Sequence, residues 1–483
     1  MNYQIFNKSE VSEDRPAIIS SNRILSYREF YDEVKITAGR LNLLGVKKGS
    51  HQAILSGNNT DFIILLFALW HLQAVPIPMN IRLLDNEIKD LIDHSESEMI
   101  FIHSDLRYRI SDQRKRIFPF SSDVDSTITD AANIEGSVPG ADETALILYT
   151  SGTTGRAKGV MLSYSNLLHS AYSADEMIKH IPADRWLASL PFYHIGGISI
   201  PVRAFLFGAS IVLPDSLKAE DIEVSLEKFN PTLASFVSTT LKQLLLSNVA
   251  PNPGLRLVLL GGGPIEDELA IKATEKGWII AKVYGATETS SLVTSVNINQ
   301  NPEKSPSAGK PLASNRIYIV DENNNRLSAN KSGEVVVSGN SVMKGYWKET
   351  ALSELKLKSN MYYSGDLGFL DQDGYLYIES RRTDLIVTGG ENVNPLEVET
   401  ALLKFTDIKE VCVFPLSDKK WGQTVAALIV QGSRLLNVQS LKECLKDNLS
   451  PFKIPKKIFY TDKLPRTSLG KIKREQIRQM YNK

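Results

Sequence analysis

Short apolar segments alternate with helical patterns along the first part of the chain, and this alternation restricts the fold more than any other feature of the sequence. HQAILSG at residues 51–57 is typical of a strand, FIILLFALWHLQ at 62–73 of a buried helix, and VPIPMN at 75–80 of a short extended segment. Further on, LRLVLLGGGP at 255–264 predicts a strand that runs into a glycine turn, and a helical pattern follows it. Because such helices cover the faces of a sheet, the pattern predicts layered α/β structure.

The pattern changes after about Leu312. The segments RIYIVDENNNRLSANKSGEVVVSG and YYSGDLGFLDQDGYLYIES predict strands joined by tight turns, and hence a β-rich subdomain. From Leu385 onward the sequence predicts a compact α+β mixture of two or three helices and short strands. We therefore expect a large N-terminal domain, residues 1–383, and a small C-terminal domain, residues 384–483.

Composition excludes several classes of protein. Lys plus Arg and Asp plus Glu both number 55 among 483 residues, so no overall charge favours nucleic acid as a partner. The apolar run at 62–70 is too short to span a bilayer, and the N-terminus lacks the apolar region of a signal peptide. The two cysteines form no disulfide framework, and Cys412 is expected as a small buried hydrophobe, which together favour a cytoplasmic location. Self-association stays open.

The stretch LYTSGTTGRAKGVMLS, residues 148–163, has the chemistry of a phosphate-binding loop. Its glycines let the backbone approach a ligand, its hydroxyls can donate hydrogen bonds, and Arg156 and Lys158 add positive charge. The residues expected at phosphate are Thr150, Ser151, Gly152, Thr153, Thr154 and Lys158. The Walker A spacing is absent, and a plain turn between two strands is the alternative.

Five further segments follow in order: YGATETS at 284–290, YYSGD at 362–366, RRTDLIVTGGENVNPLEVE at 381–399, WGQ at 421–423 and PRTSLGK at 465–471. In this order the six segments closely resemble the adenylate-forming enzymes, which include acyl-CoA synthetases, peptide-synthetase adenylation domains and firefly luciferase. The resemblance implies that a carboxylate attacks the α-phosphorus of ATP, that pyrophosphate leaves, and that the acyl-adenylate then reacts with a thiol. ATP, Mg²⁺ and coenzyme A are the cofactors it implies.

The resemblance also implies roles for individual residues at the nucleotide. Tyr284 would stack on adenine beside Gly285, Thr287 would bind phosphate, and Glu288 would hold magnesium. Asp366 and Arg382 would bind the ribose, with Arg381 as a surface cation. Gly261, Gly262 and Gly263 would form a backbone wall beside the adenine and the acyl group, although a tight strand exit also explains them.

The C-terminal segments carry the rest of the implied chemistry. Lys471 would bridge the attacking carboxylate and the α-phosphate. The small domain would be mobile, with Asp384 as its hinge, and Gly389 and Gly390 would leave room for the pantetheine arm of CoA. A separate carrier protein is the alternative thiol, and a non-catalytic nucleotide-binding relative is the alternative to an enzyme.

Within the family, the segments at 189–210, 259–264 and 284–291 look most like the 2-succinylbenzoate–CoA ligases of menaquinone biosynthesis. His194 would then sit at the entrance of the acyl pocket, with Gly261 and Ser238 in its walls. Arg203, a lone cation among apolar neighbours, would bind the second carboxylate of the diacid. The alternatives are a structural role for His194 and Arg203, helix capping by Ser238, and an aromatic or medium-chain monocarboxylate as substrate.

Overall fold

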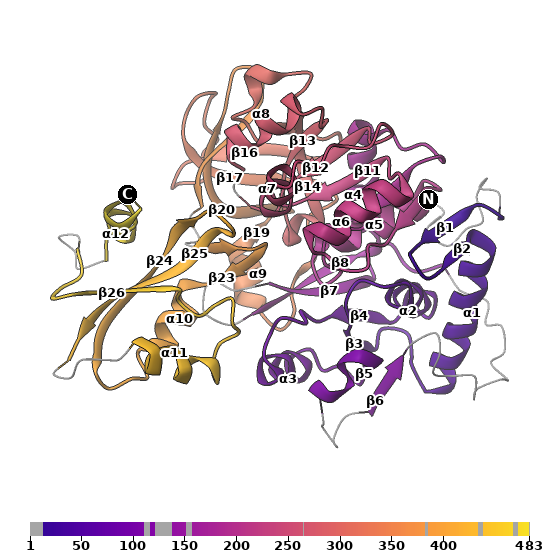
Figure 1. Ribbon diagram of the computed structural model, residues 1–483, viewed down its shortest axis with the longest axis horizontal. Coiled ribbons are helices and arrows are strands. Elements are labelled where there is room, and N and C mark those ends of the chain that lie inside the picture. Colours follow the sequence, from indigo (N-terminus) through magenta and orange to yellow (C-terminus); the bar gives the residue numbers. More distant parts are fainter. Residues whose placement is uncertain are drawn as a thin grey trace. The chain divides into compact units, whose positions relative to one another are not determined.

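The computed structural model describes residues 13–110, 116–120, 138–150, 157–263, 265–381, 385–432, 438–466 and 472–482 (Figure 1). The chain forms two compact units. The first comprises Met1–Ile81, Lys89–Tyr149 and Gly159–Ser380, and the second comprises Arg82–Ile88, Thr150–Lys158 and Arg381–Lys483.

The largest sheet of the first unit has nine strands, and six consecutive ones, from β13 to β1, are parallel. Their order is β15 (Lys310–Pro311), β14 (Ser291–Asn297), β13 (Ile280–Ala286), β12 (Leu257–Leu260), β11 (Leu233–Phe236), β9 (Arg185–Leu187), β10 (Ser210–Val212), β1 (Pro16–Ile19) and β2 (Ile24–Ser26). The central strands read as short apolar runs because both faces of the sheet are covered.

Alternate residues of these strands point to two different cores. Trp186, Leu257 and Leu259 belong to one core, whereas Val258 and Leu260 belong to the other. The first core also contains residues of α1 (Tyr27–Leu43), α2 (Thr60–His71), α4 (Tyr164–Ile178) and α5 (Ile195–Leu206). The second contains residues of α6 (Ala219–Phe229), α7 (Ser238–Leu246) and α8 (Asp267–Glu275). The sheet is therefore the middle layer of an α/β sandwich.

Three smaller sheets complete the first unit. A parallel sheet has the order β4 (Val75–Pro78), β3 (His51–Leu55), β5 (Met99–His103) and β6 (Arg116–Phe120). A second sheet consists of β18 (Gly345–Tyr346), β8 (Lys158–Ser163) and β7 (Thr144–Thr150). The third has β16 (Arg316–Val320), β17 (Gly333–Ser338), β20 (Met361–Leu370) and β19 (Leu357–Lys358), with β21 (Leu376–Arg381) paired to β20. The remaining helical segments are α3 (Asp85–His94), α9 (Thr350–Lys356), η2 (Ser104–Arg109), η3 (Thr287–Thr289) and η4 (Pro302–Lys304).

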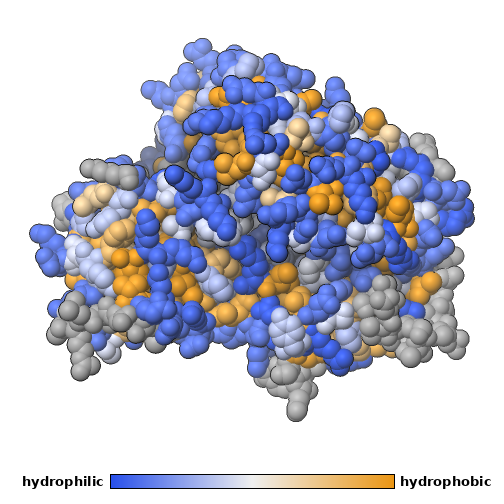
Figure 2. Space-filling view, in the orientation of Figure 1, coloured by the Kyte–Doolittle hydropathy of each residue, from blue (hydrophilic) through white to orange (hydrophobic). Residues whose placement is uncertain are grey.

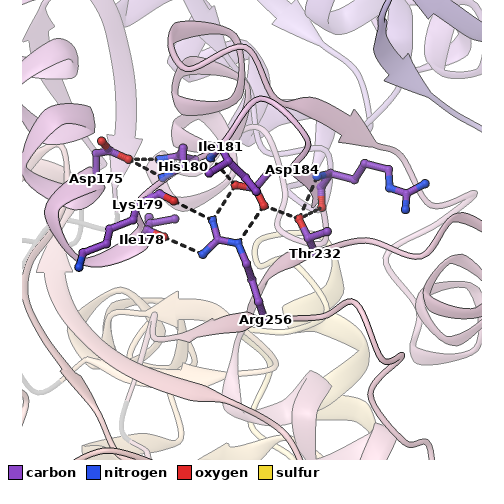
Figure 3. Close-up of polar contacts among 9 residues, drawn as sticks. Asp175, Ile178, Lys179, His180, Ile181, Asp184, Thr232 and Arg256 are labelled. Atoms are coloured by element: carbon purple, nitrogen blue, oxygen red, sulfur yellow. Dashed lines mark hydrogen bonds and ion pairs between the residues drawn. The ribbon is translucent and has the colours of Figure 1, made fainter.

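A buried ion pair fastens the edge of the large sheet at which the parallel strands begin (Figure 3). Arg256, directly before β12, donates to both carboxylate oxygens of Asp184, through Nε at 2.9 Å and Nη2 at 2.6 Å. Its Nη1 also donates to the carbonyl of Ile178 at the end of α4, at 2.8 Å. Asp184 accepts further hydrogen bonds from the backbone N–H of Ile181 and the hydroxyl of Thr232. Burial alone would raise the pKa of Asp184, but these hydrogen bonds and Arg256 lower it. One carboxylate thus ties the starts of β9, β11 and β12 to α4.

The second unit has its own sheet, in the order β23 (Glu391–Val393), β22 (Ile386–Thr388), β25 (Gly422–Gln431) and β24 (Ile408–Asp418), with β26 (Lys457–Thr461) parallel to β25. Figure 1 shows β24, β25 and β26 side by side. The helices are α10 (Pro395–Leu402), α11 (Val438–Lys446) and α12 (Arg474–Tyr481). Residues of α10 and α11 share a core with the sheet, and Cys412 is fully buried in a second core with residues of α12, as expected.

The expected α/β class and most predicted elements are confirmed, including the buried helix at 62–70, which is α2. Two details were wrong. The segment IPVRAFLFGA around Arg203 predicts a short helix with proline near its start, whereas the helix begins at Ile195 and Pro201 lies inside it. The strands expected in the small domain were short, whereas β24 and β25 have 11 and 10 residues. They form one long antiparallel pair.

Hydrophilic residues predominate on the face seen in Figure 2, with hydrophobic residues in scattered groups between them. Scattered apolar residues are normal on a folded protein. None of the helices in the described ranges combines the length and the hydrophobicity needed to cross a lipid bilayer.

Candidate active site

Three parallel strands end side by side, and several of the predicted site residues follow them. Phe236 of β11 pairs with Leu260 of β12, and Leu260 pairs with Lys282 of β13. The segments beyond these pairs carry Ser238, Gly261 and Tyr284, respectively. The carboxyl edge of parallel strands is the usual ligand site of α/β sheets, and the fold therefore gathers these residues at one edge.

The first glycines after β12 are required by close packing. A Cβ atom on Gly261 would lie 2.6 Å from a side-chain carbon of Val283, and Gly262 has a φ of +81°. Any larger residue at Gly261 would push β12 and β13 apart, and the left-handed backbone at Gly262 favours glycine. These contacts fit both a tight strand exit and a backbone wall. The helix α7 begins at Ser238 with Val237 as its N-cap, so Ser238 does not occupy the N-cap position.

The turn from β13 to β14 is strained around the predicted nucleotide motif. A Cβ atom on Gly285 would lie 1.9 Å from the carbonyl oxygen of Ser291. Ser290 and Ser291 both have positive φ, 55° and 100°. The Thr289 hydroxyl holds the turn: it accepts from the Ala286 N–H at 2.9 Å and can donate to the carbonyl of either Ser291 or Ala286, at 2.9 and 3.1 Å. Backbone strain held in this way is typical of functional sites.

Tyr284 and Asp366 meet across two sheets. The hydroxyl of Tyr284, in β13, donates to Oδ2 of Asp366, in β20, at 2.8 Å. Asp366 is nearly buried, and its backbone N–H donates to the hydroxyl of Ser364. The arrangement holds a carboxylate, which can accept hydrogen bonds from a ribose, beside an aromatic ring, which can stack on a base.

Glu288, in η3, is held by a buried phenol. The hydroxyl of Tyr346, in β18, donates to its Oε1 at 2.9 Å, and the Met343 backbone N–H donates to its carbonyl at 2.9 Å. Burial, followed by the charge of Glu288, raises the pKa of Tyr346, so the phenol stays protonated. Magnesium prefers oxygen ligands and is usually bound through one or two carboxylates together with substrate phosphates, so the Glu288 carboxylate fits this ion.

The predicted phosphate loop connects two neighbouring strands. Thr150 ends β7, and Lys158 begins β8, where its side chain is buried. Ser151, Gly152, Thr153 and Thr154 lie outside the described residues. The flanking geometry thus agrees with a loop between strands and leaves the phosphate role of the loop a prediction.

His194 occupies the N-cap position of α5, without a side-chain capping bond. The segment before it is fixed by Asn58, whose amide donates to the carbonyls of Ala188 and Leu190 at 3.2 and 2.8 Å. A Cβ atom on Gly197 would lie 2.0 Å from the Pro191 carbonyl oxygen, so the first turn of α5 packs directly on this segment. The backbone at His194 is therefore fixed by the packing of this segment.

Arg203 is buried on α5, at the same helical spacing as Ile195 and Ser199, which lie eight and four residues earlier. Only 2% of its surface is exposed, and its guanidinium lies 5.9 Å from the ring centroid of Trp186. Its Nε and Nη2 have no hydrogen-bond acceptor among the described residues. Burial lowers the pKa of Arg203 to about 9, and the same cation, after burial itself, lowers the pKa of the nearby His180. A buried guanidinium without an acceptor is costly and calls for an anionic ligand.

In the second unit, two predicted motifs pack against each other. Gly389 and Gly390, between β22 and β23, have φ values of +58° and +83°. The N–H of Gly389 donates to the carbonyl of Trp421, and a Cβ atom there would lie 2.8 Å from the indole. The N–H of Val387 donates to the side chain of Gln423 at 3.0 Å. The Trp421 indole therefore explains the need for glycine at position 389. Three other predicted residues, Arg382, Asp384 and Lys471, lie outside the described residues.

The sequence matches the AMP-binding enzyme family over residues 5–347 and the AMP-binding enzyme C-terminal domain over residues 397–471. The chain belongs to this family. The predicted resemblance to adenylate-forming enzymes is thereby confirmed. The family match alone does not test the roles of single residues.

Full-length relatives extend this finding. The chain is 34% identical over 472 residues to 2-succinylbenzoate–CoA ligase of Bacillus licheniformis, covering 97% of this chain and 98% of the relative. It is also similar to a double mutant of o-succinylbenzoate CoA synthetase (MenE) from Bacillus subtilis bound to a product analogue, with a TM-score of 0.91, 32% identity, and coverage of 99% and 98%. The same synthetase in complex with ATP and magnesium gives a TM-score of 0.75 at 32% identity, with 98% of each chain covered.

Two residues of this AMP-binding enzyme had no signal in the sequence. Asn58 follows β3 and fixes a segment 130 to 132 residues away. Tyr346 stands in an unremarkable β-rich stretch, yet its phenol donates to Glu288. Their roles depend on contacts between sheets, which spacing along the chain does not report.

Proposed function

We propose that this AMP-binding enzyme is an ATP-dependent acid–CoA ligase that forms an acyl-adenylate and then a thioester, and that its acid is 2-succinylbenzoate. The full-length similarity to ligases of that name supports the choice of substrate. In this proposal its partners are the small diacid, ATP and CoA, and no nucleic acid takes part. We further propose a cytoplasmic location, and light scattering would decide whether the enzyme self-associates.

In the first step the substrate carboxylate attacks the α-phosphorus of ATP, and pyrophosphate leaves. Asp366 accepts hydrogen bonds from the ribose hydroxyls. Tyr284 lies against the adenine, and the Tyr284 hydroxyl keeps the Asp366 carboxylate oriented. Thr287, Thr150 and Lys158 bind phosphate oxygens together with the loop at 151–154. When bound at Glu288, magnesium would neutralise phosphate charge. Positioning and charge neutralisation are the main needs of such a step.

Arg382, Asp384 and Lys471 complete the proposed reaction. Lys471 contacts the attacking carboxylate and the α-phosphate, and Arg382 binds the ribose. Rotation of the small domain at Asp384 then brings the turn at Gly389 and Gly390 to the pantetheine thiol, which attacks the acyl carbonyl and releases AMP. Domain rotation of this kind is an ordinary hinge mechanism.

The observation that carries the choice of a diacid is the buried guanidinium of Arg203. Two of its nitrogens lack acceptors among the described residues, although burial of such a cation is unfavourable. An acid that enters beside His194 and reaches Arg203 must be elongated and carry a second anionic group, and 2-succinylbenzoate has both properties.

A panel of acids tests the proposal. The purified enzyme is incubated with ATP, Mg²⁺, CoA and one acid at a time, and both pyrophosphate and acyl-CoA are measured. We expect 2-succinylbenzoate to give the highest kcat/KM, with benzoate, 4-phenylbutyrate and octanoate far below it. Equal rates with monocarboxylates would refute the diacid assignment. Pyrophosphate without acyl-CoA would instead indicate a carrier protein as the thiol.

A further inference from the structure

Glu288 is the end point of a chain of phenols that joins three sheets. It follows β13 of the nine-stranded sheet, Tyr346 belongs to β18 of the sheet that flanks the phosphate loop, and Tyr362 belongs to β20. Tyr346 donates to Oε1 of Glu288 at 2.9 Å, and Tyr362 forms a side-chain hydrogen bond with Tyr346. Tyr346 and Tyr362 are 3% and 5% exposed. Both phenols therefore belong to the interior and not to the solvated rim of the site.

The direction of these hydrogen bonds follows from which groups can donate, and the Tyr346 hydroxyl donates to Glu288. Because the Glu288 carboxylate can only accept, Tyr346 donates to it, and Tyr362 donates to Tyr346. A hydroxyl that accepts one bond is a stronger donor in the next, so Tyr362 strengthens the bond to Glu288.

The two oxygens of Glu288 are consequently different. Oε1 is occupied by Tyr346, whereas Oε2 has no hydrogen-bond donor among the described residues. A carboxylate bound on one oxygen cannot rotate freely about its last torsion. The other oxygen is therefore presented in one direction before any ligand arrives.

We propose that Tyr346 is a positioning residue for the metal-binding carboxylate of Glu288, and that Tyr362 supports it. The inference rests on the proposed function, in which Glu288 holds the magnesium of MgATP. Magnesium demands near-octahedral geometry and tolerates misoriented ligands poorly, so a carboxylate fixed in advance lowers the cost of binding. Since Tyr346 of β18 pairs with Val160 of β8, the same contact ties Glu288 to that sheet.

Tyr346→Phe removes only the hydroxyl and keeps the ring that packs in the core. Tyr362→Phe is the second variant. Tyr363→Phe is the matched control, because Tyr363 is the next residue of β20 and packs in a different cluster, with Val320 and Val336. None of the three substitutions changes a charge or creates a large cavity.

The measurement is metal-dependent binding of a non-hydrolysable ATP analogue. Its dissociation constant is determined by calorimetry with Mg²⁺ and with EDTA, and Mn²⁺ binding in the ternary complex is followed by electron paramagnetic resonance. For Tyr346→Phe we expect metal affinity to fall about 10- to 100-fold while metal-free nucleotide affinity stays unchanged. Tyr362→Phe should cause a smaller loss of the same kind, and Tyr363→Phe none.

Metal affinity equal to wild type in Tyr346→Phe overturns the inference. If that variant does not fold, metal affinity equal to wild type in Tyr362→Phe overturns it as well. A uniform loss of nucleotide affinity with and without metal, in either variant, would show a structural role and also overturn it. Failure of the proposed function is recognised separately, since the wild-type protein would then release no pyrophosphate with any acid of the panel.

Discussion

Replacement of Arg203 by leucine should raise stability and destroy selectivity for the diacid. Burial lowers the pKa of this guanidinium to about 9, which corresponds to destabilisation of the charged form on the order of a few kcal/mol, partly offset by the Trp186 ring. Below about pH 9 the guanidinium is charged in both the folded and the unfolded protein, so this cost to folding stability applies in full. Above that pH the folded protein loses the proton before the unfolded chain does, and the cost becomes smaller. We therefore expect Arg203→Leu to unfold at a temperature about 2–5 °C higher at pH 7.5.

The catalytic effect should have the opposite sign. Two guanidinium nitrogens, Nε and Nη2, lack an acceptor among the described residues, and hydrogen bonds to charged groups contribute about 1.5–3 kcal/mol each. Loss of the pair should therefore cost about 2–5 kcal/mol, or roughly 30- to 5000-fold, in kcat/KM for 2-succinylbenzoate. Monocarboxylates have no second charge and should change by less than about threefold.

The assay compares kcat/KM for the diacid and for a monocarboxylate from the acid panel, together with thermal unfolding with and without the diacid. Arg203→Lys is the matched variant, since it keeps the charge but loses the planar two-point geometry, and it should recover only part of the diacid rate. If both kinds of acid lose the same factor, or if Arg203→Leu unfolds at a lower temperature than wild type, Arg203 is a structural residue and the reasoning fails.

Three further predictions concern other parts of the enzyme. Lys471→Ala should nearly abolish pyrophosphate release while sparing thioester formation from a supplied acyl-adenylate; release near the wild-type rate would exclude its proposed role. Asp384→Pro should slow full turnover more than it weakens ATP binding, because proline fixes φ near −65°, and unchanged rates in both half-reactions and in turnover would remove Asp384 as the hinge. Gly285→Ala should destabilise the protein by about 2–4 kcal/mol in urea unfolding, because its Cβ would lie 1.9 Å from the Ser291 carbonyl oxygen, and an unchanged midpoint would contradict this packing.

Local signals predicted much of the fold. The helix α2 and the strands β12 and β13 were found because an uninterrupted apolar run, or a run that ends in glycine, leaves few alternatives. The start of α5 was misplaced because Pro201 resembles a helix beginning, whereas burial of the whole face from Ile195 onward keeps the helix intact on both sides of it. Tertiary packing outweighed the local preference of proline there.

Short sequence motifs were sufficient to single out some of the candidate site residues. Glu288 and Asp366 stand in short motifs, and the structure places each beside a tyrosine hydroxyl. Tyr346 could not be found, because its partner Glu288 is 58 residues away and the contact depends on how two sheets approach each other. The lone charge of Arg203 among apolar residues did predict its burial, but the missing acceptors became visible only in the structure.

The Asp184–Arg256 ion pair has a consequence for how such an enzyme can change. It clamps the edge of the large sheet where the parallel strands begin, whereas Ser238, Gly261 and Tyr284 follow the opposite edge. Substitutions that reshape the acid pocket therefore act far from the contacts that hold α4 to the strands. Laboratory evolution toward new acids should tolerate many changes at the ligand-facing edge and very few at Asp184, so the accepted mutations would divide the sheet into a variable half and an invariant half.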